Sequence, residues 1–132
     1  MPGDNDAIDW RSLREFANVD LTRSFVLSWH FEAETLFIDM DIHLLPDHPF
    51  YEKPRPAEKV CIRAALIEFP FCTDVCVGES TGRDDISAFV SRLGHGAIAG
   101  LERRGDGRYE IRGDFGTVTI EAERPVMRLK GP

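Results

Sequence analysis

Four polar side chains near the middle of the sequence could do chemistry together. Asp39, Asp41 and His43 alternate with apolar residues in the stretch FIDMDIH, and His48 follows in the next segment. Carboxylates and imidazoles are common metal ligands and proton carriers. Alternate side chains of a β-strand share one face, so this spacing would place the first three on the same side of a sheet. The set supports the hypothesis of a metal-assisted or small-ligand-binding enzyme.

An ordinary amphipathic strand explains the same residues more simply. Alternate strand positions lie about 6–7 Å apart, which is wide for three ligands of one ion. The chain also lacks a phosphate-binding loop and a dinucleotide fingerprint. We therefore expect Asp39, Asp41 and His43 to lie on a solvated strand face, with no metal and no cofactor, and we favour a binding role over an enzymatic one.

A second group of candidate residues lies in the proline-rich segment LPDHPFYEKPRP, residues 45–56. Its four prolines restrict their own backbone and that of the preceding residues, so the segment should be extended and stiff. His48, Tyr51 and Arg55 can donate hydrogen bonds, stack and pair with carboxylates. Loops held by a scaffold often carry binding residues, so these three join Asp39, Asp41 and His43 as predicted binding residues.

Two alternating stretches should position the first candidate group. Residues 24–32 and 36–45 each alternate apolar and polar side chains, which predicts a hairpin turning at Ala33–Glu34. These two residues are poor formers of a tight two-residue turn, so a four-residue connection is an alternative. The pairing that keeps the apolar face together predicts six buried residues: Phe25, Leu27, Trp29, Ile38, Met40 and Ile42.

The rest of the chain predicts a mainly β protein of about seven strands and one or two short helices. Residues 58–69 are apolar on both faces, which predicts a strand covered on both sides. Glycine-rich breaks after residue 96 predict an antiparallel meander, with DFG (114–116) as a turn. Helices are expected at residues 6–17 and 84–93. We expect an antiparallel sandwich or half-closed barrel in one domain, residues 1–132.

The charge distribution restricts the class of partner. The net charge is −7, and residues 1–48 carry all of it, with ten acids and three bases. An acidic chain repels phosphate backbones, so we expect no nucleic-acid binding. No apolar run approaches the ~20 residues that span a bilayer, and the acidic start does not resemble a signal peptide, so we expect a cytoplasmic protein without membrane contact.

The three cysteines do not form a recognisable metal or redox motif. Cys72 and Cys76 are separated by three residues, and Cys61 stands alone. The spacing is neither that of a redox pair nor that of one half of a zinc site. We expect free thiols, while a tight turn would leave a disulfide between Cys72 and Cys76 open as an alternative.

Three stretches together resemble a group of small bacterial proteins of unknown function. These are LTRSFVLSWHFEAETLFIDMDI, HPFYEKPRPAE and YEIRGDFGTVTI, within residues 20–123. The resemblance implies a bacterial, cytoplasmic, single-domain protein and assigns no catalytic residue. With the acidic first third, it leads to the hypothesis of an interaction module that neutralises or regulates a basic protein partner, or that forms a homodimer. A domain without a recognisable site is a further alternative.

Overall fold

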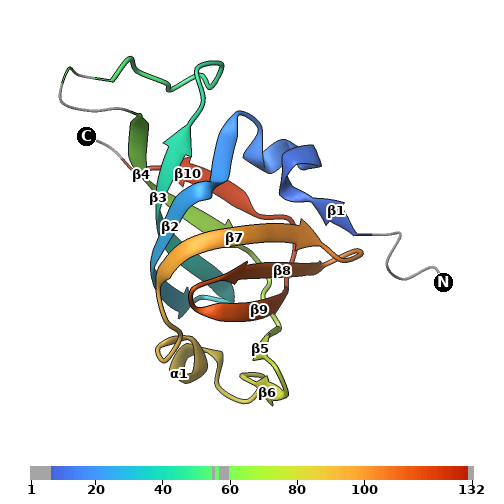
Figure 1. Cartoon of the computed structure of the whole chain (residues 1–132). Helices are drawn as coiled ribbons and strands as arrows, with labels where there is room; N and C mark the ends of the chain where they lie inside the picture. Colours follow the sequence, from blue (N-terminus) through green and yellow to red (C-terminus); the bar gives the residue numbers. More distant parts are fainter. Residues whose placement is uncertain (1–6, 55, 57–59, 131–132) are drawn as a thin grey trace.

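A single open antiparallel sheet makes up most of the protein (Figure 1). The structure is a computed structural model that describes residues 7–54, 56 and 60–130. The sheet order is β10-β4-β3-β2-β7-β8-β9-β5-β6, and β1 pairs with β7 beside this path. The predicted β-rich antiparallel fold is therefore confirmed, with ten strands in place of about seven. The strands are β1 (Ile8–Asp9), β2 (Val19–Glu32), β3 (Thr35–Leu44), β4 (Cys61–Phe69), β5 (Asp74–Val77), β6 (Ser80–Thr81), β7 (Gly96–Arg103), β8 (Arg108–Gly113), β9 (Gly116–Glu121) and β10 (Val126–Leu129).

The predicted hairpin is formed by β2 and β3, and its turn lies at Ala33–Glu34 as expected. Glu32 pairs directly with Thr35, so the connection has two residues. Both turn residues have positive φ, +52° and +63°, which is the backbone of a type I′ turn. The Cys72 backbone N–H donates a 2.8 Å hydrogen bond to the Glu34 carbonyl, and this bond attaches the turn to the following segment.

The predicted register of this hairpin holds near the turn and fails beyond it. Trp29 pairs with Ile38, but Val26 pairs with Met40 and Phe25 with Asp41, because β2 has an extra residue between Val26 and Ser28. A one-residue bulge moves the preceding side chains to the opposite face, here as far as Phe25, where a second register shift begins. The prediction that Phe25 and Leu27 are buried is therefore wrong: they are 44% and 49% exposed, whereas the other four predicted core residues are buried.

Strand β4 also differs from its prediction as a strand covered on both sides. Cys61, Ala65, Ile67 and Phe69 are buried, but the alternate residues are exposed or half-buried. Ile62 is 39% exposed. One face of β4 therefore packs on the core, while the other carries apolar side chains at the surface.

The helical content is lower than predicted. The described residues contain one α-helix, α1 (Ile86–Val90), and Asp85 caps its start by accepting a hydrogen bond from the Ala88 N–H. The expected N-terminal helix is wrong. Two short 3-10 turns, η2 (Trp10–Ser12) and η3 (Arg14–Phe16), are separated by Leu13 in an extended conformation. Their apolar side chains are nevertheless buried, as the helical pattern required.

The C-terminal meander is confirmed for β7, β8 and β9, but not for the last strand. Tyr109 and Ile111 of β8 are buried opposite Ile120 and Val118 of β9. The connection between these strands is a tight turn with Gly116 at φ +97°. Strand β10 does not continue this series, since it pairs with β4 at the opposite end of the sheet.

Candidate binding site

Strand β10 forms one edge of the sheet. It pairs with β4 on one side, and in the described part of the chain no strand pairs with its other side. Turn η3 lies beside the beginning of β10 without extending the sheet. An edge strand presents a row of backbone donors and acceptors that can pair with another extended chain.

The pairing with β4 fixes which backbone groups of β10 face outward. The Lys130 N–H donates a 2.9 Å hydrogen bond to the Ala64 carbonyl, and Arg128 lies opposite Leu66 in the same register. In an antiparallel ladder, hydrogen-bonded positions alternate with positions whose N–H and C=O groups point to the other side. The backbone groups of Met127 and Leu129 therefore point away from β4, toward the free edge.

The side chains of β10 separate into an apolar face and a basic face. Met127 and Leu129 are half-buried and pack against the core. Arg128 lies on the opposite face and is exposed, as is Val126. The basic face continues at Lys130, which lies beyond the last residue of the strand.

Two hollows flank this edge and meet at Met127. The larger, about 760 Å³, is lined by residues 49–52 of the proline-rich segment, residues 62–64 of β4 and residues 127–130. The smaller, about 390 Å³, lies between η3 and the chain before β10, and its lining includes Arg14, Glu15 and Pro125. We call the free edge of β10 together with these two hollows the β10 groove. It offers backbone partners, apolar surface and charges in one continuous region.

The charged side chains around the β10 groove form ion pairs in which the basic partner on the β10 side is the more exposed. Arg128 Nε donates a 2.7 Å hydrogen bond to Glu68 Oε2, with side-chain exposures of 64% and 22%. Lys130 Nζ donates to Asp39 Oδ1, with exposures of 49% and 26%. Exposed pairs of this kind contribute at most about 1 kcal/mol, so the two cations can exchange partners at little cost.

The proline-rich segment forms one wall of the β10 groove. Tyr51 is half-buried against the core and lines the larger hollow, where Phe50 is 64% exposed. Arg63 of β4 pairs with Glu52 at 3.2 Å and fixes the segment to the sheet. Figure 1 shows this segment extending beyond the ends of β3 and β4. The structure thus brings the predicted binding residue Tyr51 beside β10.

His48 lies in the same segment but has a local structural role. Its Nδ1 accepts a 3.1 Å hydrogen bond from the Phe50 N–H, and its backbone carbonyl accepts one from Tyr51. Partial burial lowers the pKa of His48 below its ordinary value, which favours the neutral ring. The third residue predicted in this segment, Arg55, lies outside the described residues.

The three side chains of FIDMDIH do not share one environment. Asp39 is half-buried and is held by Lys130 and by Ser28, whose hydroxyl donates at 3.1 Å. Asp41 is also half-buried and lies between Phe25 and Ala64 on the neighbouring strands. His43 is only 7% exposed, so the expectation of a solvated histidine is wrong. His43 lies opposite Asp20 of β2, and its backbone N–H donates to the buried Ser24 hydroxyl.

Within residues 7–54, 56 and 60–130, no three His, Cys, Asp or Glu side chains are grouped closely enough to hold a metal ion. This result gives no support to the metal-site hypothesis for Asp39, Asp41, His43 and His48. Likewise, no helix in this part of the chain is long and apolar enough to cross a bilayer.

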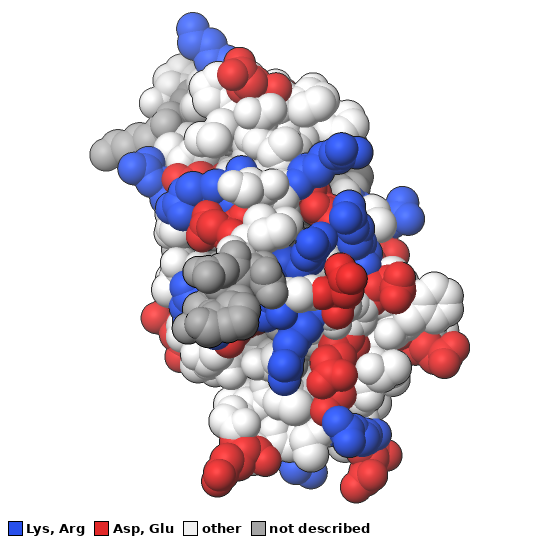
Figure 2. Space-filling view, turned by 90° about the vertical axis from the view of Figure 1, so that its right-hand side faces the viewer, with Lys and Arg blue, Asp and Glu red and all other residues white. Residues whose placement is uncertain are grey.

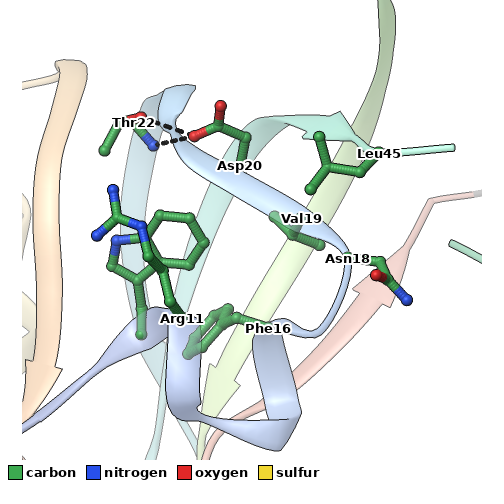
Figure 3. A pocket seen from close by; sticks show the side chains of 8 residues that line it. Arg11, Phe16, Asn18, Val19, Asp20, Thr22 and Leu45 are labelled. Atoms are coloured by element: carbon green, nitrogen blue, oxygen red, sulfur yellow. Dashed lines mark hydrogen bonds between the residues drawn. The ribbon is translucent and has the colours of Figure 1, made fainter. Parts of the chain in front are cut away.

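A separate hollow of about 290 Å³ lies at the start of β2 (Figure 3). The Arg11 guanidinium lies 4.5 Å from the centre of the Trp10 ring and pairs with Asp9 at 3.1 Å. Asp20 Oδ1 accepts hydrogen bonds from the Thr22 N–H and hydroxyl. The charged groups here are satisfied by their neighbours, which indicates a structural role in closing this end of the fold. The Trp10 indole N–H is buried without a partner among the described residues.

A buried carboxylate organises the other end of the sheet. Asp74 of β5 is 1% exposed and accepts hydrogen bonds from the Thr81 hydroxyl at 2.6 Å, Arg83 at 3.1 Å and the Cys76 thiol at 3.3 Å. Burial raises its pKa, but these bonds outweigh burial and hold the pKa of Asp74 below the ordinary value. We call Asp74 and its three partners the Asp74 cluster.

The cysteines of this region are free thiols, as expected. Burial raises the pKa of Cys72 to about 11, and burial also raises the pKa of Cys76. Protonated thiols are poor nucleophiles, so these residues do not form a reactive site.

The sequence alone pointed to Tyr51 but not to the remainder of the β10 groove. The segment RPVMRLK, residues 124–130, contains the stretch VMRLK (126–130), which the sequence pattern predicts as the last strand of the C-terminal meander and to which it assigns no binding role. Its three bases and absence of acids could mark it as a binding candidate. Its position at the edge of the sheet follows only from its pairing with β4.

Basic and acidic side chains are mixed on one face of the molecule. Figure 2 shows Lys and Arg side chains interleaved with Asp and Glu on the face turned toward the viewer. On β7 and β8, for example, Arg112 pairs with both Glu102 and Glu110. The acidic excess in the sequence therefore does not give a uniformly acidic surface on this face.

Comparison with known proteins gives no assignment. No family model, no curated protein and no solved structure matches the chain.

Proposed function

We propose that the protein is a binding module that takes up an extended segment of a partner protein at the β10 groove. The observation that carries this proposal is the orientation of the Met127 and Leu129 backbone groups toward a free edge. An extended peptide that adds to a sheet edge obtains affinity from main-chain hydrogen bonds and specificity from pockets for its alternate side chains. The β10 groove supplies both kinds of contact.

The hollows beside the edge distinguish β10 from an ordinary sheet edge. The partner side chains that project toward the core side would contact Met127, Leu129 and Tyr51, which are half-buried and preformed. A preformed site loses little conformational entropy on binding, and this favours affinity. The ion pair between Arg63 and Glu52 connects the proline-rich wall of the groove to β4 before any partner binds.

Selection from a displayed library of random ten-residue peptides tests this function. The edge is blocked by Met127→Pro, which removes an outward N–H and leaves the ladder with β4 intact; proline is tolerated at such edge positions. Met127→Leu is the matched control, because it keeps the N–H and nearly the same volume. We expect the selected peptides to bind Met127→Pro roughly fivefold or more weakly, and Met127→Leu as tightly as the wild type.

N-methylated peptides provide a second measurement that leaves the protein unchanged. Alternate amides of a bound strand face β10 and point away from it. Methylating the amides that face β10 should abolish binding, and methylating the others should leave binding intact. Equal effects of the two methylation patterns, or peptides that bind Met127→Pro as well as the wild type, would contradict strand addition at β10.

A further inference from the structure

We infer that the partner segment of the β10 groove is acidic and alternates in character, with carboxylates on one face and apolar side chains on the other. This inference rests on the proposed function and identifies the chemistry of the partner. It follows from the charge of β10, from the alternation of its side chains, and from the surroundings of Arg128 and Lys130.

The charge of β10 and its flanking residues is uniform in sign, whereas Glu15 and Glu52 lie in the lining of the two hollows. Residues 124–130 contain three bases, Arg124, Arg128 and Lys130, and no acid. Arg124 is exposed and lines the smaller hollow, where Arg14 is also found. A strand paired beside β10 would place its outward side chains within reach of Arg128, since directly opposed residues in a sheet are neighbours. Carboxylates at those positions would be attracted, whereas lysines would be repelled.

The alternation of β10 fixes the periodicity of the partner. Met127 and Leu129 point to the core side, and Arg128 points to the outer side. Side chains of neighbouring strands at paired positions share a face. The partner therefore needs an apolar residue at every second position and an acidic residue between them.

A second copy of the chain fits this edge poorly. If two β10 strands pair about Arg128, each Arg128 faces its symmetry mate, and Val126 faces Lys130. If they pair about Met127, Arg128 lies opposite Val126 of the mate and close to its other basic residues. Like charges directly opposed across strands are destabilising, and basic residues on an edge are a known protection against self-pairing.

Two acids of the chain itself occupy the cations while the site is free. Glu68 holds Arg128, and Asp39 holds Lys130. An acidic partner must compete with them, so removing the Asp39 charge should strengthen its binding. A basic partner attracted to the acidic strand face would instead be weakened by the same change. Asp39→Asn therefore separates the acidic-partner inference from the hypothesis of a basic partner.

The test uses three synthetic ten-residue peptides that alternate valine with glutamate, glutamine or lysine. Fluorescence anisotropy with the full chain should show the glutamate peptide binding about tenfold or more tightly than the lysine peptide, with affinity that falls as salt rises. The double variant Arg128→Gln/Lys130→Gln should bind the glutamate peptide about five- to tenfold more weakly, and Asp39→Asn about twofold more tightly. The charge-matched control Arg23→Gln/Arg92→Gln, which alters exposed arginines away from β10, should bind like the wild type.

Amide hydrogen exchange separates failure of this inference from failure of the proposed function. If all three peptides protect the Met127 and Leu129 amides equally, strand addition stands and the acidic specificity is overturned. If none of them protects these amides, the proposed function falls as well. If sedimentation shows a dimer whose Met127 and Leu129 amides are protected without peptide, the occupant is a second copy, and the inference of an acidic partner is overturned.

Discussion

The two ends of the sheet differ in what happens to their polar groups, which are satisfied within the fold at one end and face outward at the other. At the β5–β6 end, the last strand has two residues, and the buried Asp74 binds three side chains around it. At the β10 end, backbone groups face outward and the cations are more exposed than their acidic partners. A polar group satisfied within the fold contributes stability, whereas a group that faces a hollow remains available to another molecule. The contrast assigns a structural role to the Asp74 cluster and leaves the β10 groove, where we propose binding, with outward-facing groups.

Removal of the Asp74 carboxylate should give the largest effect on stability. Asp74→Ala leaves Thr81, Cys76 and Arg83 without their shared acceptor and should lower the free energy of unfolding by about 3 kcal/mol. Asp84→Ala, at an exposed position in the same region, is the control and should change it by less than about 0.5 kcal/mol. Chemical denaturation measures both values. Equal losses in the two variants would remove the distinction between the ends of the sheet.

The stability of the protein should depend on pH through the same carboxylate. Because the pKa of Asp74 is lower in the folded than in the unfolded chain, its contribution is present above the unfolded pKa, about 3.9, and is lost as pH falls through the folded pKa. Asp74→Asn should therefore flatten the acid limb of a melting-temperature profile between about pH 2 and 5. An acid limb that stays as steep in the variant would show that other carboxylates produce it.

Thiol labelling should report how tightly the β5–β6 end is closed. Cys61 and Cys72 are buried, and Cys76 is partly exposed. At pH 8 the folded protein should not react at Cys61 and Cys72, because they are buried, and should react slowly at Cys76, because its raised pKa keeps the thiolate fraction small. Unfolded protein should release all three thiols, and Cys76→Ser should abolish the native reaction. Rapid native labelling at Cys72 would contradict a closed end.

The smallest effect on stability is expected at the β10 groove. Arg128→Gln/Lys130→Gln removes two exposed ion pairs and should change the free energy of unfolding by less than about 1 kcal/mol. The same variant is expected to lose peptide affinity. A loss of affinity with little loss of stability is therefore expected at this end of the sheet and not at the other. A loss of unfolding free energy comparable with that of Asp74→Ala would show that Arg128 and Lys130 have a structural role.

Local patterns predicted much of the fold. Alternation identified β2, β3, β8 and β9, and it placed the turn at Ala33–Glu34 correctly. The N-terminal segment was predicted as a helix because Trp10, Leu13 and Phe16 have helical spacing, and two 3-10 turns with an extended residue between them bury the same side chains. In this segment, burial was therefore easier to predict than backbone conformation.

Long-range pairing could not be read from the sequence. Strand β10 pairs with β4, which precedes it by more than 50 residues, while its neighbour in sequence, β9, pairs with β5. Nothing in RPVMRLK specifies that choice, so the β10 groove could not be assembled from local patterns. Tyr51 was predicted because prolines mark its segment, but its position beside β10 depends on tertiary packing.

Two register shifts interrupt the alternation of β2, one between Asp20 and Phe25 and the other, the bulge, between Val26 and Ser28. Leu27 is the residue without an opposite partner between the Val26–Met40 and Ser28–Asp39 pairs. Deleting Leu27 would place Val26 and Trp29 two positions apart, so both would stay buried in an alternation that runs without a break from Ser24 to Phe31. Deletion of Phe31 would instead shift the register of Trp29 against β3 by one residue and move its side chain to the opposite face. The strand should therefore accept the loss of a residue at the bulge more readily than at Phe31, so the bulge is the point at which the length of β2 could change.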